Sequence, residues 1–453
     1  MKRITITAIL VLIVSLAVHS QTTFIKTLSF PQNHDGYAVR PAFDGGYIIA
    51  SKGPPALLIK TDAQGDTLWT RKLPMFLPNS ENVLLQTPDS GIVICGGNSN
   101  MMLMKTDKNG DSVWSASYQE GTACAVEQTG DGGFILAGSR YYEVFLVKTG
   151  PVGNLQWSNV YYPLNVTNVR TTPASVKQTP DSGFAVAGNR WDTTSVFLMK
   201  TGNNGELAWS KGYRNTILLT CNSLCNGHGG GFILAGGAGP AFISTAIAKT
   251  DAAGSVEWNK KYSSTFMGSY GLMSVSPVNG GGYIATGEFA PPGDNSQLSL
   301  VRINDAGDSL WTRVFQNGFQ YMAIGYSARQ TPDNGFILSG NVIDISAGTN
   351  QLYLIKTDSN GNVFPSGIGP EETAPEVRIY PNPCHGTLTV EAGNERISRI
   401  EIFDMTGICA VNREYPGNKD GKTVISLPAG MKGLYILRLT TGDSPRVSKI
   451  SIL

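Results

Sequence analysis

Lys-Thr-Asp-Ala-Gln-Gly-Asp-Thr-Leu-Trp, residues 60–69, is the first copy of a phrase that recurs along the chain. In six copies a lysine or arginine stands nine residues before a tryptophan. A seventh copy opens at Lys356 and reaches Gly361, but it ends at Phe364 without a tryptophan. The other five copies span 105–114, 148–157, 200–209, 249–258 and 302–311. Such self-similarity predicts a repeat architecture in which each copy belongs to one structural unit.

A second phrase, a polar turn followed by glycine and three apolar residues, alternates with the first. It reads Asp-Gly-Gly-Tyr-Ile-Ile at 44–49, and its seven copies each precede one copy of the first phrase. Successive repeats start 43 to 54 residues apart, and each offers four short β-rich runs separated by polar turns. That period is typical of a four-stranded propeller blade. Because helical periodicity never extends beyond two turns, we predict an all-β, seven-bladed β-propeller over residues 21–364, with six or eight blades as alternatives.

The beginning of the chain supplies a strand that the last repeat lacks. Phe24–Leu28 aligns with Trp69–Leu73, which is the tryptophan strand of the first repeat. We therefore predict that the N-terminal strand completes the seventh blade. This pairing would remove an exposed sheet edge and close the ring.

The aspartates of the first phrase invite a calcium-binding interpretation, with Asp62 and Asp66 as one pair. An EF-hand needs more oxygen ligands in a twelve-residue loop, and two copies carry Gly150 and Gly202 in place of the first aspartate. We interpret the phrase as a tight hairpin in which Asp caps the turn and Gly takes a positive φ. The tryptophans resemble packing residues of quinoprotein-type propellers, and the turn is similar to the Asp-box of sialidase-like propellers with a longer spacing. We expect no metal and no cofactor.

Loop lengths indicate where a ligand would bind. The lysine-to-tryptophan interval is constant, whereas the count from the second-phrase glycine to the next lysine or arginine varies from 14 to 21 residues. The variable loops share one face of a propeller, and function commonly lies in variable loops on a rigid scaffold. Aromatic and arginine side chains there suit a glycan or a protein partner. The candidate ligand-binding residues are Arg140, Tyr141, Tyr142, Tyr161, Arg190, Trp191, Phe242, Phe289 and Tyr321.

A search for catalytic motifs is negative. The sequence has no nucleophile elbow, zinc-protease motif or phosphate-binding loop, so we assign no catalytic residue and expect a non-enzymatic binding module. A propeller can nevertheless bring distant carboxylates together. The alternative is a secreted hydrolase or lyase that acts on polysaccharide from the variable-loop face, with Asp192, Glu288, Asp294 and Asp344 as the residues to test.

The first residues predict export. Lys2 and Arg3 precede an apolar stretch over 4–18, and small residues precede Gln21. We predict a signal peptide over residues 1–20 and Sec export to the periplasm; a retained anchor is the alternative. No other stretch is long and apolar enough to predict a transmembrane segment. A net charge of +1 without a dense basic run argues against nucleic acid as a partner.

Six cysteines in an exported chain raise the question of disulfides. Cys95 with Cys124, and Cys384 with Cys409, are possible pairs. We favour buried free thiols, because the spacing is not that of a disulfide-stapled miniprotein.

The last part of the chain has a different character. A linker rich in Pro and Gly over 365–376 is followed by short alternating strands, which predict an immunoglobulin-like β-sandwich over 377–453. Val-Arg-Ile-Tyr-Pro-Asn-Pro at 377–383 resembles the opening of type A sorting domains of the Bacteroidetes type IX secretion system, and the later blocks of that domain follow in order. The motif residues are Tyr380, Pro381, Asn382, Pro383, Gly407, Gly433, Tyr435 and Lys449.

This resemblance implies a partner and a location. It implies that the type IX machinery carries the protein across the outer membrane and that the sorting domain is removed near the linker. The propeller would then be released or attached to lipopolysaccharide at the cell surface. A generic adhesive sandwich is the alternative interpretation of the same segment.

Overall fold

The computed structural model divides the chain into two compact units, Met1–Ser366 and Gly367–Leu453. It contains no helix, within the residues it describes, that is long and apolar enough to cross a membrane. The expected signal peptide and linker lie outside the described residues. These residues are 22–165, 168–191, 195–213, 218–238, 244–262, 271–289, 295–315, 321–363, 377–392, 395–404, 409–415, 421–441 and 444–453.

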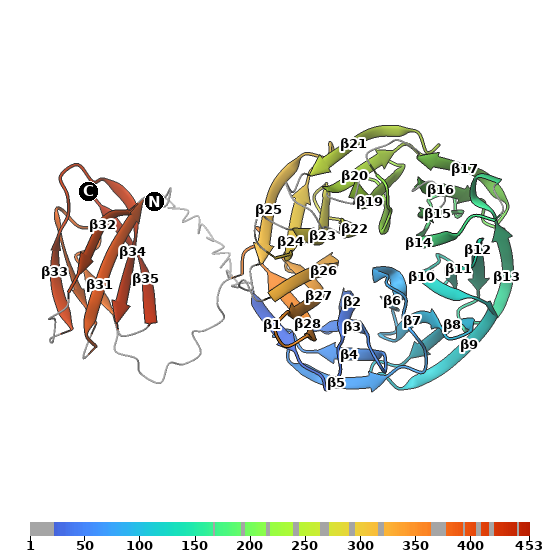
Figure 1. The fold of residues 1–453 in the computed structure, drawn as a ribbon, viewed down its shortest axis with the longest axis horizontal. Coiled ribbons are helices and arrows are strands. Elements are labelled where there is room, and N and C mark those ends of the chain that lie inside the picture. Colours follow the sequence, from blue (N-terminus) through green and yellow to red (C-terminus); the bar gives the residue numbers. More distant parts are fainter. Residues whose placement is uncertain are drawn as a thin grey trace, which may run out of the picture. The chain divides into compact units, whose positions relative to one another are not determined.

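The described strands of the first unit form seven four-stranded antiparallel sheets around a common axis (Figure 1). We number the sheets from 1 to 7 in chain order. Sheet 1 contains β2 (Asp35–Pro41), β3 (Tyr47–Lys52), β4 (Leu57–Thr61) and β5 (Thr67–Lys72). Sheet 2 contains β6 (Leu84–Gln86), β7 (Ile92–Gly97), β8 (Asn100–Thr106) and β9 (Ser112–Glu120). Sheet 3 contains β10 (Thr122–Gln128), β11 (Phe134–Arg140), β12 (Glu143–Thr149) and β13 (Leu155–Tyr161).

The remaining sheets continue the ring with the same order. Sheet 4 contains β14 (Thr171–Gln178), β15 (Phe184–Arg190), β16 (Ser195–Thr201) and β17 (Leu207–Tyr213). Sheet 5 contains β18 (Ser223–Asn226), β19 (Phe232–Ala238), β20 (Ser244–Thr250) and β21 (Val256–Tyr262). Sheet 6 contains β22 (Leu272–Pro277), β23 (Tyr283–Phe289), β24 (Gln297–Ile303) and β25 (Ser309–Phe315). Sheet 7 contains β26 (Tyr321–Gln330), β27 (Phe336–Asp344), β28 (Thr349–Thr357) and β1 (Phe24–Leu28).

The first strand of each sheet lies nearest the axis, and the last strand lies at the circumference (Figure 1). Two short 3-10 helices, η1 (Glu81–Val83) and η2 (Pro163–Asn165), stand before the inner strands of sheets 2 and 4. The two middle strands of a sheet are buried along nearly their whole length, as in β3 and β4, whereas β5 is exposed or half-buried. The all-β propeller class predicted from the repeats is confirmed.

Strand β1 takes the outermost place in sheet 7. Phe24 stands opposite Lys356 in the same register in which Trp69 stands opposite Lys60. A methyl group added at Gly65 would come within 2.6 Å of the Phe24 ring, so this ring packs directly on the first-phrase glycine of sheet 1. The same aromatic-on-glycine contact joins the other neighbouring sheets, through Trp69–Gly110, Trp114–Gly153, Trp157–Gly205, Trp209–Gly254, Trp258–Gly307 and Trp311–Gly361.

The first phrase forms a capped turn, which confirms its structural interpretation. Asp62 Oδ1 accepts hydrogen bonds from the backbone N–H groups of Gln64 at 3.0 Å and Asp66 at 2.8 Å. Gly65 has φ +82°, a value that glycine adopts without steric strain. The turn can therefore stay short, and the outer hairpin has the same geometry in successive sheets.

An ion pair between a buried lysine and a partly exposed aspartate joins the two phrases within a sheet. Lys148 Nζ lies 2.8 Å from Asp131 Oδ2 and also donates to the backbone oxygen of Thr149 at 2.9 Å. Sheets 5 and 6 have no aspartate in the second phrase; there Lys249 pairs with Glu257, and Arg302 donates to backbone oxygens. The pairs equivalent to Lys148–Asp131 in sheets 1, 2, 4 and 7 are Lys60–Asp44, Lys105–Asp89, Lys200–Asp181 and Lys356–Asp333.

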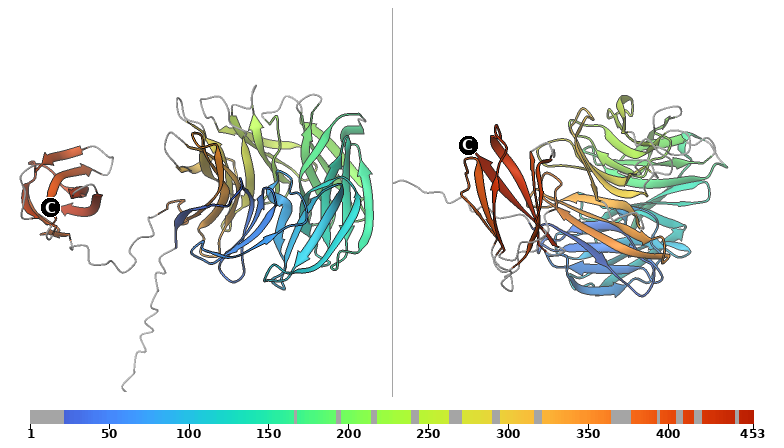
Figure 2. Two further views of the ribbon diagram at one scale, coloured as in Figure 1. Left: turned by 60° about the horizontal axis from the view of Figure 1, so that its bottom comes forward. Right: turned by 60° about the vertical axis from the view of Figure 1, so that its left-hand side comes forward.

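The second unit has two antiparallel sheets, whose twisted strands are visible in Figure 2. One sheet contains β29 (Arg378–Tyr380), β30 (Thr387–Glu391) and β33 (Lys422–Ser426). The other contains β31 (Ile397–Asp404), β32 (Cys409–Glu414), β34 (Gly433–Thr441) and β35 (Ser444–Ile452). Apolar side chains of both sheets, including Leu388, Ile425, Ile402 and Leu437, form one buried cluster.

All six cysteines are free thiols. Cys409 is exposed and the other five are buried. Burial raises the pKa of the Cys124 thiol to about 11, so this group stays protonated at neutral pH.

Candidate functional site

Two of the expected ligand-binding residues form the exposed tip of a hairpin in sheet 3. Tyr141 and Tyr142 make the turn between β11 and β12, and their side chains are 74% and 45% exposed. Tyr141 has φ +53°, an uncommon value for a residue with a side chain, and the centres of the two rings are 6.5 Å apart. The Arg140 guanidinium lies 5.6 Å from the Tyr141 ring and 2.7 Å from the Glu120 carboxylate. Both rings are thus presented to solvent.

Trp191 lies beside this tip in sheet 4 and is 53% exposed. Its indole N–H donates to Thr172 Oγ1 at 3.4 Å, and the Arg170 guanidinium lies 5.8 Å from its ring. The backbone N–H of Thr171 donates to the backbone oxygen of Tyr141 at 3.4 Å, which joins the two sheets at this point. We call Tyr141, Tyr142 and Trp191, with Arg140 and Arg170, the aromatic surface.

Other expected ligand-binding residues lie elsewhere. Tyr161 is buried, and its hydroxyl donates to the backbone oxygen of Gly205 at 2.5 Å. Tyr213 makes the equivalent bond to Gly254, so this tyrosine position ties neighbouring sheets together. Arg190 is buried at the end of β15. Phe289 ends β23 in sheet 6 and Tyr321 begins β26 in sheet 7, and both are half-buried. These two strands lie across the ring from β11 and β15 of sheets 3 and 4 (Figure 1). Phe242 is outside the described residues.

Of the four carboxylates considered for catalysis, two lie in the described part of the ring. Glu288 is buried within β23. Asp344 is exposed at the end of β27, and its Oδ1 accepts hydrogen bonds from the backbone N–H groups of Ser346 at 2.9 Å and Ala347 at 3.0 Å. Asp192 and Asp294 lie outside the described residues. Within those residues, no group of three or more His, Cys, Asp or Glu side chains could hold a metal ion.

Two sets of equivalent residues lie at two levels along the axis of the ring. Both are counted back from the turn glycine of the second phrase, which is the glycine directly before its apolar residues, such as Gly46. The eighth residue before that glycine defines the serine level, which consists of Ala38, Val83, Ala125, Ser175, Ser223, Ser274 and Ser327. The sixth residue defines the charged level, which consists of Arg40, Leu85, Glu127, Lys177, Cys225, Ser276 and Arg329. All seven residues of the charged level line one cavity.

The side chain of Glu81, from η1, is buried at the serine level. Its Oε1 accepts from Ser223 Oγ at 2.6 Å, and its Oε2 accepts from Ser274 Oγ at 2.8 Å and from Ser327 Oγ at 3.2 Å. Arg329 Nη1 lies 2.7 Å from Oε2. Burial alone would raise the pKa of Glu81, but Arg329, Arg40 and the hydroxyl groups hold it below its usual value. One ionised carboxylate therefore ties η1 to sheets 5, 6 and 7.

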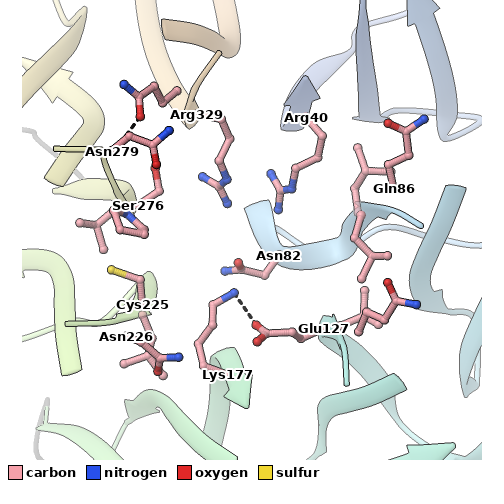
Figure 3. Close-up of a pocket in the computed structure, with 18 residues that line it drawn as sticks. Arg40, Asn82, Gln86, Glu127, Lys177, Cys225, Asn226, Ser276, Asn279 and Arg329 are labelled. Carbon is pink, nitrogen blue, oxygen red and sulfur yellow. Dashed lines mark hydrogen bonds and ion pairs between the residues drawn. The ribbon is translucent and has the colours of Figure 1, made fainter. Parts of the chain in front are cut away.

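At the charged level the axis widens into a cavity of about 580 Å³, which we call the axial cavity (Figure 3). The side chains of Arg40, Lys177 and Arg329 point into it around the amide of Asn82. Lys177 Nζ lies 2.7 Å from Glu127 Oε2. The inner strands end at this level in the short turns of the second phrase. In an antiparallel sheet these turns share a face with the lysine-to-tryptophan turns of constant length, so the cavity lies toward that face. It is therefore remote from the variable-loop face on which we expected the ligand.

Sequence reasoning missed the axial residues, although the repeat contains a signal for them. When the seven copies are aligned on the turn glycine, the sixth preceding position reads Arg, Leu, Glu, Lys, Cys, Ser and Arg. Inner strands of a propeller pack around one axis, so a position with charged residues in four of seven copies marks a polar axis. Glu81 itself has no such signal, because it lies in the connection before β6.

In the second unit, residues of the expected sorting motif hold the last strand. Asn382 Oδ1 accepts from the backbone N–H of Ser451 at 2.8 Å. Cys384 N–H donates to the backbone oxygen of Ser451 at 2.9 Å, and Leu453 N–H donates to that of Cys384 at 3.0 Å. The hydroxyl of Tyr380 donates to Glu391 Oε2 at 2.9 Å. The motif therefore fixes the end of β35 against the segment that precedes β30.

The other motif residues are spread over this unit. Pro381 and Pro383 both follow cis peptide bonds. Tyr435 packs against the buried cluster from β34, which begins at Gly433 with φ +98°. Gly407 and the side chain of Lys449 lie outside the described part of the structure.

Comparison with known proteins assigns the second unit. Residues 378–453 match the secretion system C-terminal sorting domain. Among solved structures, the chain is similar to a protein of unknown function from Bacteroides caccae, with 13% identity over 64% of this chain and 97% of that chain and a TM-score of 0.40. It is also similar to BamB from Moraxella catarrhalis, with 14% identity over 82% of this chain and 97% of that chain and a TM-score of 0.40. A third similar structure is the Dos1 propeller, with 13% identity over 81% of this chain and 92% of that chain and a TM-score of 0.46. No curated protein is similar enough in sequence to count as a match.

These findings define the class of protein: the chain is an exported protein with a β-propeller fold. Its C-terminal unit is a sorting domain of the type IX secretion system, as the motif residues predicted. This domain engages the type IX machinery, which takes the protein to the cell surface or into the medium.

Proposed function

We propose that this exported propeller is a non-enzymatic binding module and that its aromatic surface binds a glycan. The observation that carries the proposal is the presence of three exposed aromatic residues, Tyr141, Tyr142 and Trp191, on the neighbouring sheets 3 and 4, whose backbones are joined by the hydrogen bond from Thr171 to Tyr141. Exposed aromatic rings offer flat apolar faces on which sugar rings stack. Arg140 and Arg170, at the edges of the surface, supply donors for sugar hydroxyl or carboxylate groups.

The small number of residues in the aromatic surface favours a glycan over a protein partner. A specific protein interface takes about 20 to 30 residues from each side, whereas this surface consists of three aromatic and two arginine residues. The backbone hydrogen bond from Thr171 joins β14 to Tyr141, and the Trp191 indole donates to the next residue of β14, Thr172; these contacts limit the entropy lost when a ligand binds.

We further infer a seven-bladed propeller over residues 21–364 and an immunoglobulin-like sandwich over 377–453, joined by the linker 365–376. The seven four-stranded sheets and the place of β1 in sheet 7 support the first part. The cluster shared by two sheets supports the second. Cleavage of the signal peptide before Gln21 and removal of the sorting domain after secretion complete the proposed maturation. The mature propeller is then released or attached to lipopolysaccharide.

The test is a glycan array probed with the full chain, followed by titration of any bound glycan against the Trp191→Ala variant. Loss of one stacking ring should weaken binding about fivefold or more, since an aromatic contact contributes about 1 kcal/mol or more. Phe43→Ala is the matched control, because Phe43 is an exposed aromatic residue in the turn between β2 and β3 of sheet 1, whereas the aromatic surface lies on sheets 3 and 4.

Two results would count against this function. Equal glycan affinity of the wild type and the Trp191→Ala variant would remove the aromatic surface from binding. Hydrolysis or elimination of a bound polysaccharide by the full chain would show an enzyme, and the binding-only role would then be wrong.

A further inference from the structure

We propose that the axial cavity is a second ligand site, separate from the aromatic surface, and that it binds the carboxylate of a small organic acid. The cavity is lined by all seven sheets and has a volume of about 580 Å³. Small-molecule sites fall in the range of about 300 to 1,000 Å³, so a monosaccharide-sized acid fits this space.

The charges around the cavity do not balance. Arg40, Lys177 and Arg329 are cationic, while Glu81 and Glu127 are anionic, which leaves an excess of one positive charge. Arg329 is paired with Glu81, and Lys177 is paired with Glu127. Among the described residues, Arg40 has no carboxylate within 4.0 Å. An anion with a single negative charge would neutralise the excess positive charge of the cavity. A phosphate monoester carries a larger charge, about −1.5 to −2 at neutral pH.

Arg40 donates its hydrogen bonds to neutral groups in the described structure, and the carboxylates of Glu81 and Glu127 attract it only from a longer distance. It donates to the backbone oxygens of Val39 and Glu81, each at 2.8 Å, and to Ser327 Oγ at 3.4 Å. Burial, followed by repulsion from Arg329, lowers the pKa of Arg40 to about 9. Of these two guanidinium groups, only that of Arg329 forms an ion pair with a carboxylate in the described residues, and a ligand carboxylate between them would accept hydrogen bonds from both.

Asn82 supplies an independent indication of a ligand. Its side chain lies on η1, is only 3% exposed and points into the cavity (Figure 3). Its Nδ2 is buried and, within the described residues, has no hydrogen-bond partner. A buried donor without an acceptor costs about 1 to 3 kcal/mol, and a ligand oxygen would recover that energy.

The remaining wall groups suit the rest of such a molecule. Amide side chains of Gln86, Gln128, Asn226, Asn279 and Gln330 line the cavity. Two of them have one atom committed to a neighbouring sheet: Asn226 Nδ2 donates to the backbone oxygen of Gln178 at 2.9 Å, and Asn279 N–H donates to Gln330 Oε1 at 2.8 Å. Amides fixed in this way can exchange hydrogen bonds with ligand hydroxyl groups, which favours a hydroxy acid or an acidic sugar.

The test is isothermal titration of the full chain with four probes: glucuronate, lactate, glucose and inorganic phosphate. At least one of the two carboxylates should bind, glucose should not, and phosphate should bind more weakly than the better carboxylate. Arg40→Gln should weaken carboxylate binding about 10- to 100-fold, the range expected for a hydrogen bond between charged groups. Arg71→Gln is the matched control, because Arg71 forms an exposed ion pair with Asp111 on the outer strand.

A second variant keeps the proposal testable if Arg40→Gln does not fold. Glu127→Gln removes a negative charge and frees Lys177, so carboxylate affinity should increase severalfold and fall again as salt is added. A purely structural role for this ion pair does not predict tighter binding. Trp191→Ala should leave carboxylate binding unchanged, which separates this site from the aromatic surface.

The proposal is overturned by any of three results. These are failure of the wild type to bind either carboxylate, unchanged affinity in Arg40→Gln, and weaker affinity in Glu127→Gln. Tighter binding of phosphate than of both carboxylates would overturn the ligand class.

Discussion

Glu81→Gln is the substitution that best tests how the axis is held together. The wild-type carboxylate accepts hydrogen bonds from three serine hydroxyl groups and forms an ion pair with Arg329 at 2.7 Å. Glutamine has nearly the same shape and keeps one acceptor oxygen, but it carries no charge. Arg329 would then remain in the axis without a carboxylate.

The expected loss in the free energy of unfolding follows from these contacts. Removing one partner of a buried ion pair costs about 3 to 5 kcal/mol, because the other charge is left uncompensated. We expect about 3 kcal/mol, since the glutamine oxygen still accepts from some of the hydroxyl groups. Glu120→Gln is the control: Glu120 pairs with Arg140 at the surface, and an exposed pair contributes about 0 to 1 kcal/mol.

The effect should also depend on pH with a defined sign. The pKa of Glu81 in the folded chain lies below its ordinary value of 4.5. The stability that ionised Glu81 contributes is therefore fully present above about pH 4.5 and is lost as the pH falls through the lower folded pKa. The difference between wild type and variant should be largest at neutral pH and should shrink in acid.

Denaturant unfolding followed by tryptophan fluorescence can measure this difference in the full chain. All seven tryptophans lie between Trp69 and Trp311, so the signal reports on the propeller alone. If Glu81→Gln destabilises the propeller no more than Glu120→Gln does, the carboxylate does not hold the axis. A difference that grows on acidification would refute the electrostatic reasoning.

Two further substitutions test the ring. Phe24→Ala should destabilise the propeller by about 3 kcal/mol or more, because it removes the aromatic contact with Gly65. Ile25→Ala, at an exposed position of the same strand, should cost under about 1 kcal/mol. Equal effects of the two substitutions in thermal unfolding would contradict closure of the ring through Phe24. Asp131→Asn leaves Lys148 without its carboxylate and should cost about 1 kcal/mol, a value reduced for the exposure of Asp131. The pKa of Asp131 is lowered to about 2 from 3.8, against the effect of burial, mainly by the hydrogen bond from Lys148, so this contribution should persist above about pH 4 and disappear toward pH 2; a loss independent of pH would contradict it.

The fold could be predicted from sequence because the contacts between sheets repeat. Each outer-strand aromatic meets the turn glycine of the next sheet, as Trp69 meets Gly110, so both residues recur at a fixed spacing. The turn aspartate recurs for a local reason, since Asp62 caps backbone N–H groups two and four residues ahead. Contacts of this kind leave a period in the sequence that can be recognised without a structure.

The candidate sites were harder to predict because exposure and burial are not periodic. Tyr141 and Tyr161 both lie near strand ends in sheet 3 and look alike in sequence. Tyr141 is exposed at a hairpin tip, whereas the hydroxyl of Tyr161 reaches a glycine of the next sheet. Only the three-dimensional path of the neighbouring sheet separates the two roles. Glu81 was missed for a similar reason, because its serine partners are 142 to 246 residues away along the chain.

The geometry of a ring explains why its axis must differ from its repeated contacts. At the circumference each sheet meets only its neighbours, so the same aromatic and glycine can be used at successive interfaces. At the axis, side chains from all seven sheets approach one point, and seven identical lysines or glutamates there would repel one another strongly. Equivalent positions must therefore diverge, as they do from Arg40 through Glu127 and Lys177 to Arg329. The repeated motif that predicts the fold therefore carries no information about the residues at the axis. The proposed ligand site there is recognised at positions that are equivalent in the seven repeats but differ in residue type.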